Sequence, residues 1–416
     1  MPLSSWVPGA DGSGFPAEHL PYGVVSAPGE RPRVAVRIGD QALDLARLAA
    51  DGVVRGPFDR HSLNPFMALG PTAWAAVRER LTSLVCDPAE RAAVAPALAP
   101  VDGLTAHLPF TVADYVDCYS SIEHATNLGR LFRPDGEPLL PNWRHLPVAY
   151  HGRAGTVVVS GTPIQRPWGQ RLPPGAAAPV VGPSERLDIE LELGVVVGTP
   201  SGPGVPVPVA EAPGHVFGVV LVNDWSARDV QAWEYQPLGP FLGKSFATTI
   251  GAWVTPLAAL DAVRAPGPPQ DPEPFPHLRR DPSAPWALAL DLAVELCPAG
   301  APAAGEVVTR SSAAGLYWTF PQQLAHLTSN GAHLRTGDLV ASGTISGARR
   351  GSEGSLIELT RAGAEPLVVA GVERRFLADG DTVTLRAAAA AGPGADAARL
   401  TLAEASGTVV PGRPLT

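Results

Sequence analysis

A histidine at the expected start of a helix is the first group in this sequence that could do acid–base chemistry. In the segment DCYSSIEHATNLG, residues 117–129, Ser120 followed by Glu123 matches a capping box. This pattern predicts a helix with His124 in its first turn. The positive end of the helix dipole favours the neutral imidazole, which suits a general base. A structural histidine on the surface of a capped helix is the alternative.

Acidic residues alternate along the segment LDIELELGVVVG, residues 187–198. Asp188, Glu190 and Glu192 share one face of the predicted strand, where alternate residues are about 6.5 to 7 Å apart and like charges repel unless a cation lies among them. Carboxylate oxygens are preferred ligands of Ca²⁺ and Mg²⁺, whereas the lack of cysteine or closely spaced histidine disfavours zinc. The alternative is an ordinary strand with a solvated acidic face.

A buried strand, a polar turn and a helix are predicted within residues 215–251. Arg228, Gln231 and Tyr235 fall on one face of that helix, and Asp224 precedes them by one turn. A guanidinium, an amide and a phenol that point the same way can stabilise negative charge beside a metal-binding carboxylate. A plain ion pair between Asp224 and Arg228 is the structural alternative.

Lys244 is the only lysine among the 31 basic residues of the chain. Because arginine serves at every other basic position, we expect this position to need a compact ammonium donor that a planar guanidinium cannot replace. Gly239 and Gly243 allow close approach of the backbone just before it, and Thr248 follows. The segment matches no phosphate-binding loop motif. A lysine retained by chance is the alternative.

A glycine-rich loop around Thr344 follows a predicted strand in residues 334–360. Glu358 is predicted on the next strand. Its carboxylate could be the group that orients a catalytic histidine.

The elements that must position these groups are expected to be mainly β-strands. The 44 glycines and 46 prolines predict many turns. A net charge of −9 without a basic cluster argues against a nucleic-acid partner. Without a leader-like start or a long apolar run, we expect a soluble cytoplasmic protein with no membrane partner. The widely spaced Cys86, Cys118 and Cys297 are expected to be buried thiols.

Two domains are predicted, at residues 1–105 and 106–416. The first is expected to contain a hairpin that turns at Gly39–Asp40 and an amphipathic helix over residues 71–85. The Pro-rich and Ala-rich composition of residues 87–103 predicts a linker that closes this domain.

Long segments of the chain resemble the fumarylacetoacetate hydrolase family and, within it, the fumarylacetoacetases. These segments are DCYSSIEHATNLGRLFR, LLPNWRHLPVAYHGRA, LDIELE, NDWSARDVQAWEYQPLGPFLGKSF and ASGTISG, which occur in the right order. The resemblance implies a mainly β fold, with a small N-terminal SH3-like barrel and a C-terminal β-roll domain, in a homodimer. It also implies metal-dependent hydrolysis of the carbon–carbon bond of 4-fumarylacetoacetate to fumarate and acetoacetate, the last step of tyrosine and phenylalanine degradation.

The resemblance also implies roles for individual residues. The ligands of Ca²⁺ and/or Mg²⁺ would be Asp117, Glu190, Glu192 and Asp224, with Lys244 and Thr248 around a second cation. The catalytic groups would be His124 as the base, Glu358 as its partner, and Arg228, Gln231 and Lys244 as stabilisers of negative charge. The substrate-contacting residues would be Tyr119, Arg133, Tyr150, Tyr235 and Thr344. Departures from the family lie in the N-terminal region, the Pro-rich segments 172–185 and 265–286, expected as surface loops, and the Ala-rich segment 386–400.

Other activities of the same fold, such as acylpyruvate hydrolysis, oxaloacetate decarboxylation or isomerisation, would share the metal-binding acids. They need not share His124, Arg228, Gln231 and Lys244, so the presence of this set favours hydrolysis of a dicarboxylate diketone. A cation-binding β protein without activity would have no use for a lone lysine or for a base at a helix N-terminus.

Overall fold

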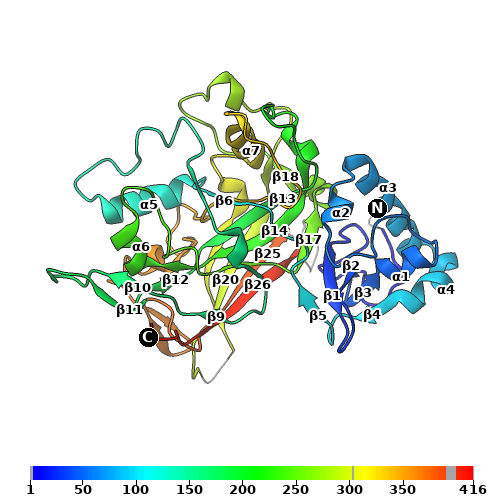
Figure 1. Cartoon of the computed structure of the whole chain (residues 1–416), viewed down its shortest axis with the longest axis horizontal. Coiled ribbons are helices and arrows are strands. Elements are labelled where there is room, and N and C mark those ends of the chain that lie inside the picture. The colour runs from blue at the N-terminus through cyan, green and yellow to red at the C-terminus, as the bar shows by residue number, and fades with distance from the viewer. Residues whose placement is uncertain (1–2, 302–303, 390–399, 416) are drawn as a thin grey trace.

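The computed structural model describes residues 3–301, 304–389 and 400–415, so most of the Ala-rich segment lies outside the described residues. A smaller N-terminal part lies beside a larger body that holds the remaining strands (Figure 1). Within these ranges, no helix has the length and apolar character needed to cross a membrane. All three cysteines are free, but only Cys118 is fully buried, so the expectation of buried thiols is correct for that residue alone.

The N-terminal part contains short strands, one long helix and several short helices. The strands are β1 (Tyr22–Ser26), β2 (Arg33–Ile38), β3 (Gln41–Asp44), β4 (Leu98–Pro100) and β5 (Thr105–His107), and the long helix is α3 (Pro71–Cys86). The predicted hairpin is confirmed, because β2 pairs with β3 around a turn in which Gly39 has a φ of 55°. Helix α3 confirms the prediction over residues 71–85, with Val77, Leu81 and Leu84 buried.

The segment 87–103 is not a linker, contrary to the prediction from its composition. It contains two 3₁₀ turns, the short helix α4 (Arg91–Val94) and strand β4, which pairs with β3. Val94 and Ala97 are buried in the N-terminal core. Burial of these apolar side chains therefore fixes a segment whose proline content suggested a loose connection.

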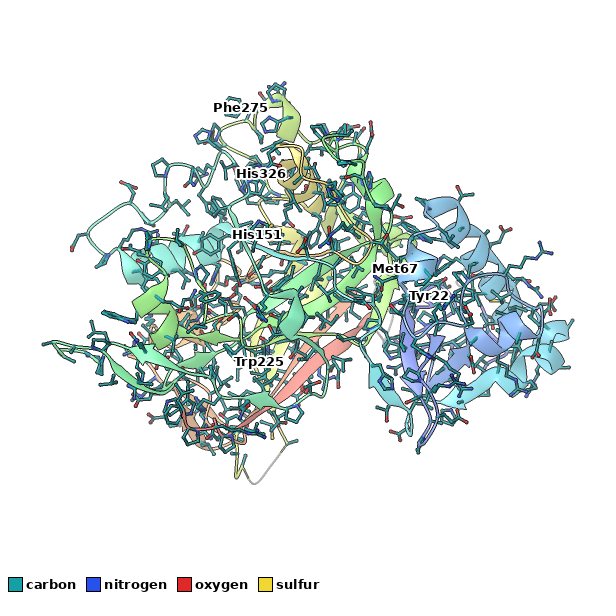
Figure 2. All side chains as sticks on the ribbon, viewed as in Figure 1. Tyr22, Met67, His151, Trp225, Phe275 and His326 are labelled. Atoms are coloured by element: carbon teal, nitrogen blue, oxygen red, sulfur yellow. The ribbon has the colours of Figure 1, made fainter. Side chains whose placement is uncertain are left out.

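The N-terminal strands belong to a thirteen-stranded sheet that continues into the larger body. Strand β1 pairs with β17 (Trp253–Pro256), and the Tyr22 ring lies 5.4 Å from Phe66 and 5.5 Å from Phe217 at this junction (Figure 2). The main strand order, β4-β3-β2-β1-β17-β14-β13-β22-β6-β7, is open, and the described residues form no closed barrel. The SH3-like barrel implied by the resemblance is therefore not confirmed.

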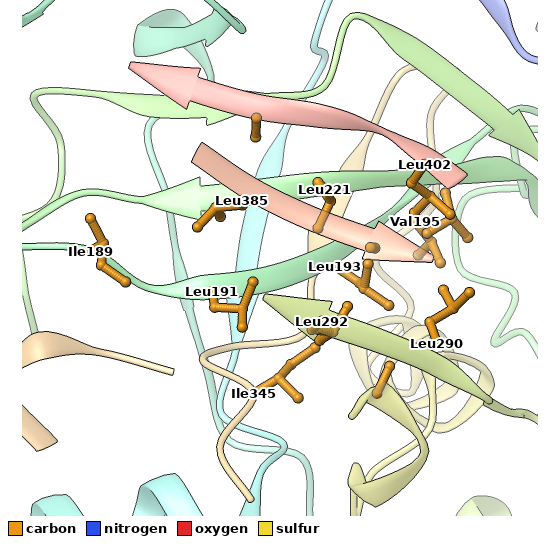
Figure 3. Packing of buried hydrophobic residues seen from close by; sticks show 14 of the residues in the cluster. Ile189, Leu191, Leu193, Val195, Leu221, Leu290, Leu292, Ile345, Leu385 and Leu402 are labelled. Atoms are coloured by element: carbon orange, nitrogen blue, oxygen red, sulfur yellow. The ribbon is translucent and has the colours of Figure 1, made fainter. Parts of the chain in front are cut away.

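Two sheets pack against each other in the body, which confirms a mainly β fold. The large sheet continues through β14 (Val216–Asp224), β13 (Leu191–Val197), β22 (Leu339–Ala341), β6 (Tyr115–Cys118) and β7 (Ala149–His151), with β16 (Thr248–Ile250) and β8 (Val157–Val159) beside it. The second has the order β21 (Glu306–Ser312), β20 (Leu290–Cys297), β25 (Thr382–Ala389), β26 (Thr401–Val410) and β9 (Ile164–Gln165). Leu193, Leu221, Leu292 and Leu385 lie in the apolar core that they share (Figure 3).

The remaining elements are short. The helices are α1 (Leu45–Ala50), α2 (Asn64–Met67), α5 (Ile122–Phe132), α6 (Arg228–Glu234), α7 (Phe320–Thr328) and α8 (Leu356–Leu359). The paired short strands are β10 (Trp168–Arg171) with β11 (Val180–Pro183), β12 (Leu187–Asp188) with β15 (Ser226–Ala227), β18 (Arg264–Ala265) with β19 (Ala287–Leu288), and β23 (Leu367–Val369) with β24 (Val372–Arg374). The Pro-rich segment 172–185 is not only a loop, because it contains β11, which pairs with β10 in a hairpin that projects from the body (Figure 1). The Pro-rich segment 265–286 connects β18 to β19.

Candidate active site and metal centre

Four buried carboxylates converge at neighbouring strands of the large sheet. Asp117 lies in β6, Glu192 in β13 and Asp224 at the end of β14, and Glu190 immediately precedes β13. One oxygen of each lies within 4.8 Å of the others. The pairing of β13 with β14 and β22, and of β22 with β6, brings these sequence-distant acids together. The structure thus gathers all four predicted metal ligands in one place.

The acidic segment 187–198 is not one regular strand with a solvated face. It is divided into β12 and β13, and all three of its acidic side chains are buried. The backbone N–H of Glu190 donates to Asn223 Oδ1 at 3.1 Å between the two strands. This break separates Asp188 from the cluster of four acids. Asp188 contacts an arginine instead.

Two of the acids have oxygens without partners among the described residues. Asp117 Oδ1 and both oxygens of Glu192 are buried and accept no hydrogen bond. Burial, and then the charge of Asp224, raises the pKa of Asp117 well above its usual range, and burial followed by the charge of Asp117 does the same to the pKa of Glu192. Buried carboxylates of this kind are stabilised by a proton or by a cation. An all-oxygen donor set fits a hard cation such as Ca²⁺ or Mg²⁺.

Binding of Ca²⁺ or Mg²⁺ is therefore expected to tighten as the pH rises. In the metal-free protein, the raised pKa values of Asp117 and Glu192 keep them protonated to higher pH than ordinary carboxyls, so at low pH a cation must displace these protons. Calorimetric titration in buffers of different ionisation enthalpy should detect proton release on binding. An affinity independent of pH and without proton release would contradict this assignment.

Lys244 connects two of the acids. Its Nζ donates to Glu190 Oε2 and to Asp224 Oδ2, the latter at 2.7 Å, and the side chain is buried. Burial lowers the pKa of Lys244, but the charges of Asp224 and Glu190 outweigh burial, so the pKa is raised and the ammonium is retained. Thr248 Oγ1 donates to Asp224 Oδ1 at 2.8 Å, and the Tyr150 hydroxyl donates to Asp224 Oδ2 at 2.6 Å.

The predicted pair of His124 and Glu358 is present. His124 Nδ1 lies 2.7 Å from Glu358 Oε2, and both side chains are buried. Glu358 is on helix α8 rather than on a strand, contrary to the sequence-based prediction. His124 does lie in the first turn of α5, but the N-cap is Ser121, whose Oγ accepts from the His124 backbone N–H at 3.4 Å. The predicted capping residue, Ser120, instead accepts a hydrogen bond from Gln323 at 2.8 Å.

Three residues that the sequence reasoning missed hold the Glu358 carboxylate. Asn127 Nδ2 donates to it at 2.9 Å, Ser346 Oγ lies 3.0 Å from both oxygens, and Ser355 Oγ donates at 2.6 Å. Burial acts to raise the pKa of Glu358, but the charge of His124 and the hydrogen bonds from His124, Ser355 and Asn127 outweigh burial and lower the pKa. Only Asn127 had a signal in the sequence, because it follows His124 by three positions on the same helix.

Arg228 pairs with two of the buried acids, Asp188 and Glu190. Its Nε donates to Asp188 at 2.8 Å, and its Nη1 lies 2.7 Å from Glu190 and 3.3 Å from Gln231 Oε1. The alternative ion pair with Asp224 is not present, because Asp224 belongs to β14 rather than to the helix. Arg228 Nη2 is buried without a partner among the described residues and is free to bind an anion.

One cavity of about 460 Å³ connects these groups. The predicted site residues that line it are Asp117, Tyr119, His124, Arg133, Tyr150, Glu190, Arg228, Gln231, Tyr235, Lys244 and Thr344. Four predicted site residues do not line the cavity, although each contacts or neighbours a group that does. They are Glu192, Asp224, Thr248 and Glu358. Apolar side chains, including Leu128, Phe132 and Trp143, form the rest of the wall.

Two close approaches shape the cavity. An added Cβ at Gly343 would lie 2.2 Å from the carbonyl oxygen of Cys118, so only glycine brings Thr344 this close to β6. The Tyr119 ring lies edge-on to the His124 ring, with centroids 5.3 Å apart. Thr344 Oγ1 is buried without a hydrogen-bond partner among the described residues, as expected for a group that contacts a ligand.

Known families match most of the chain. Residues 18–109 match the family described as fumarylacetoacetase N-terminal, and residues 115–401 match the family described as fumarylacetoacetate (FAA) hydrolase C-terminal. The fumarylacetoacetase of Rattus norvegicus is 47% identical over 401 residues, which cover 92% of this chain and 93% of that protein. The fumarylacetoacetase of Homo sapiens is 46% identical with the same coverage.

The fold also matches solved structures. The fumarylacetoacetate hydrolase of psychrophilic Exiguobacterium antarcticum is 18% identical, covers 95% of this chain and 100% of its own, and has a TM-score of 0.54. At this identity the likeness supports the fold alone.

Proposed function

Because the chain belongs to the fumarylacetoacetase family, we propose that it hydrolyses the carbon–carbon bond of 4-fumarylacetoacetate to give fumarate and acetoacetate, the last step of tyrosine and phenylalanine degradation. One observation of the site carries the proposal. Three kinds of group line one cavity: His124 of a buried histidine–carboxylate pair, Arg228 with its unpartnered guanidinium nitrogen, and Asp117 and Glu190 of the carboxylate cluster. This combination provides a base, an anion-stabilising donor and a cation site for the same substrate.

The first step requires a base that accepts a proton from water. Glu358 accepts a hydrogen bond from Nδ1–H of the neutral His124 ring, which leaves Nε2 free to take that proton. The Glu358 carboxylate, held by Ser346, Ser355 and Asn127, then stabilises the charged imidazolium. A Ca²⁺ or Mg²⁺ ion would be held by Asp117, Glu190, Glu192 and Asp224. When bound, the ion supplies Lewis-acid polarisation of the diketone oxygens.

The second step breaks the carbon–carbon bond. The water oxygen bonds to the carbonyl carbon of the fumaryl half, and the electron pair of the broken bond goes to the acetoacetate half as an enolate. Arg228 Nη2, Gln231 and Lys244 are the donors that stabilise this negative charge. His124 returns its proton to the enolate carbon, and the second proton of the water leaves the new carboxyl group to solvent as fumarate forms, so the reaction requires no other reactant.

Binding of the terminal carboxylates is assigned to the cavity wall. Arg133 lines the cavity and donates from Nη2 to the carbonyl oxygen of Pro138 at 2.7 Å, while its Nε is buried without a partner among the described residues. We assign one substrate carboxylate to Arg133 with Tyr119 and Tyr235, and contacts to the diketone to Tyr150 and Thr344.

The test follows the absorbance of the conjugated diketone during incubation of the metal-loaded protein with 4-fumarylacetoacetate. Loss of absorbance is expected to stop on chelation with EDTA and to return with Ca²⁺ or Mg²⁺. No loss with metal present would contradict the proposal and would favour acylpyruvate hydrolysis or oxaloacetate decarboxylation, the other activities of this fold.

We further propose a homodimer, a cytoplasmic location and a domain boundary near residue 105, all of which follow from the family rather than from the site. Sedimentation should give twice the chain mass of 43.1 kDa. A chain that sediments at its own mass would contradict the homodimer.

Replacement of Lys244 by arginine is expected to lower kcat by at least about tenfold, or about 1.4 kcal/mol of transition-state stabilisation. The compact Nζ fits between Glu190 and Asp224, and a planar guanidinium in the same buried space would displace one of these acids. Steady-state kinetics with saturating metal would measure the change. An arginine variant with full activity would instead favour a lysine retained by chance.

A further inference from the structure

Asp188 has no role so far, yet it is fully buried and completely hydrogen-bonded. Oδ2 accepts from Arg228 Nε at 2.8 Å and from the Ile357 backbone N–H at 3.0 Å. Oδ1 accepts from the backbone N–H groups of Leu356 and Ile189, each at 2.7 Å. Pairing of β12 with β15 fixes this geometry, because Asp188 lies opposite Ser226, two residues before Arg228.

Two of the three backbone amides that donate to Asp188, those of Leu356 and Ile357, are the first two of helix α8. The first N–H groups of a helix have no partner within the helix and usually bond to the side chain of the N-cap residue. Here the N-cap is Ser355, whose Oγ accepts no such bond and donates to Glu358. Asp188 supplies the missing acceptor from a distant strand.

We propose that Asp188 is a positioning residue of the active site, an inference that rests on the proposed function. One carboxylate holds the Arg228 guanidinium and the first turn of α8 in a fixed relation. Helix α8 carries Glu358, which orients His124, and Arg228 presents the unpartnered Nη2. The base and the anion-stabilising donor come from segments far apart in sequence, so their separation across the cavity depends on this link. A misplacement of about 1 Å can cost about 100-fold in rate.

The test compares Asp188→Asn with a matched control. Asp381 is also fully buried, accepts from the Ala299 and Ala378 backbone N–H groups, each at 2.8 Å, and pairs with Arg374, but it does not line the cavity. We expect Asp188→Asn to lower kcat by about 10- to 100-fold with little change in KM, because Asp188 contacts no substrate. Asp381→Asn should lower the Tm while kcat stays close to wild type. Equal losses of kcat in the two folded variants, or none in Asp188→Asn, would overturn the proposal.

A second measurement covers the case in which Asp188→Asn does not fold, and it needs no substrate. Arg228→Lys removes the Nε bond to Asp188, so hydrogen exchange of the Leu356 and Ile357 amides is expected to become faster. Arg374→Lys, which alters the control pair, should leave exchange at these amides unchanged. Unchanged exchange in Arg228→Lys would refute the link itself. If Arg228→Lys gives the expected faster exchange but the wild-type protein does not turn over 4-fumarylacetoacetate, the link stands and the proposed function is contradicted.

Discussion

Replacement of His124 by alanine is expected to lower kcat by about 10²- to 10⁴-fold while the fold and the metal centre persist. The loss follows from the arrangement around the ring. Glu358 engages Nδ1, and its carboxylate is itself held by hydrogen bonds from Asn127, Ser346 and Ser355, so Nε2 is the ring nitrogen left to take a proton, and alanine removes it. The carboxylate cluster does not include His124, so cation binding should survive.

The measurement combines steady-state kinetics with calorimetric titration of Ca²⁺ or Mg²⁺ into the variant. His151→Ala is a matched control, because His151 lies on the neighbouring strand β7, is exposed and does not line the cavity (Figure 2). Near-normal turnover by His124→Ala would refute the assignment of the base. Loss of metal binding together with activity would show that the variant is damaged more widely.

Replacement of Glu192 by glutamine is expected to weaken Ca²⁺ or Mg²⁺ binding by more than about 100-fold. This loss is larger than is usual when the replaced residue contacts the ligands but not the metal. Among the described residues, both oxygens of Glu192 are buried without a hydrogen-bond partner, as expected for a carboxylate that binds a cation. Because burial and the charge of Asp117 raise the pKa of Glu192 and so favour its neutral form in the metal-free protein, the neutral amide should cost less stability there than at an ordinary carboxylate. Hydrolysis should fall with metal occupancy.

Thermal unfolding with and without the ion provides the measurement. At a metal concentration of about 100 times the wild-type Kd, binding should add about 2.7 kcal/mol to the free energy of unfolding of the wild type, and this gain should fall to about 0.4 kcal/mol or less in Glu192→Gln. Asp338→Asn is the control, because Asp338 is another buried carboxylate that lies outside the cluster and accepts from the Asp114 and Arg335 backbone N–H groups. A Glu192→Gln variant with an undiminished metal-dependent rise in Tm would exclude Glu192 as a ligand.

Local patterns in the sequence determined the hairpin at Gly39–Asp40, the helix over residues 71–85 and the helix that carries His124. Each depends on interactions between residues close in sequence, so periodicity and turn residues are enough to predict it. The residue that caps helix α5 was predicted less accurately than the helix itself. Ser120 and Ser121 have the same chemistry, and the contact of Ser120 with Gln323, about 200 positions away, decided which of them caps α5.

Family resemblance, rather than periodicity, identified the members of the site. The residues of the large motifs could be named one by one because the motifs are long and ordered. Spacing alone placed Asp188 with the metal-binding acids, because a regular strand would put all three acids on one face. The break between β12 and β13 gives Asp188 a different environment, and no local pattern in the sequence predicts that break.

Only the tertiary structure decided how the chemistry is assembled. Asp117 meets Asp224 because β6, β22, β13 and β14 pair side by side, and Glu358 meets His124 because a four-residue helix packs beside α5. Such contacts are selected by the packing of whole sheets, since the free energy of burying many apolar side chains fixes which strands are neighbours. The sequence alone therefore determined which residues have the required chemistry, and long-range packing determined which of them touch.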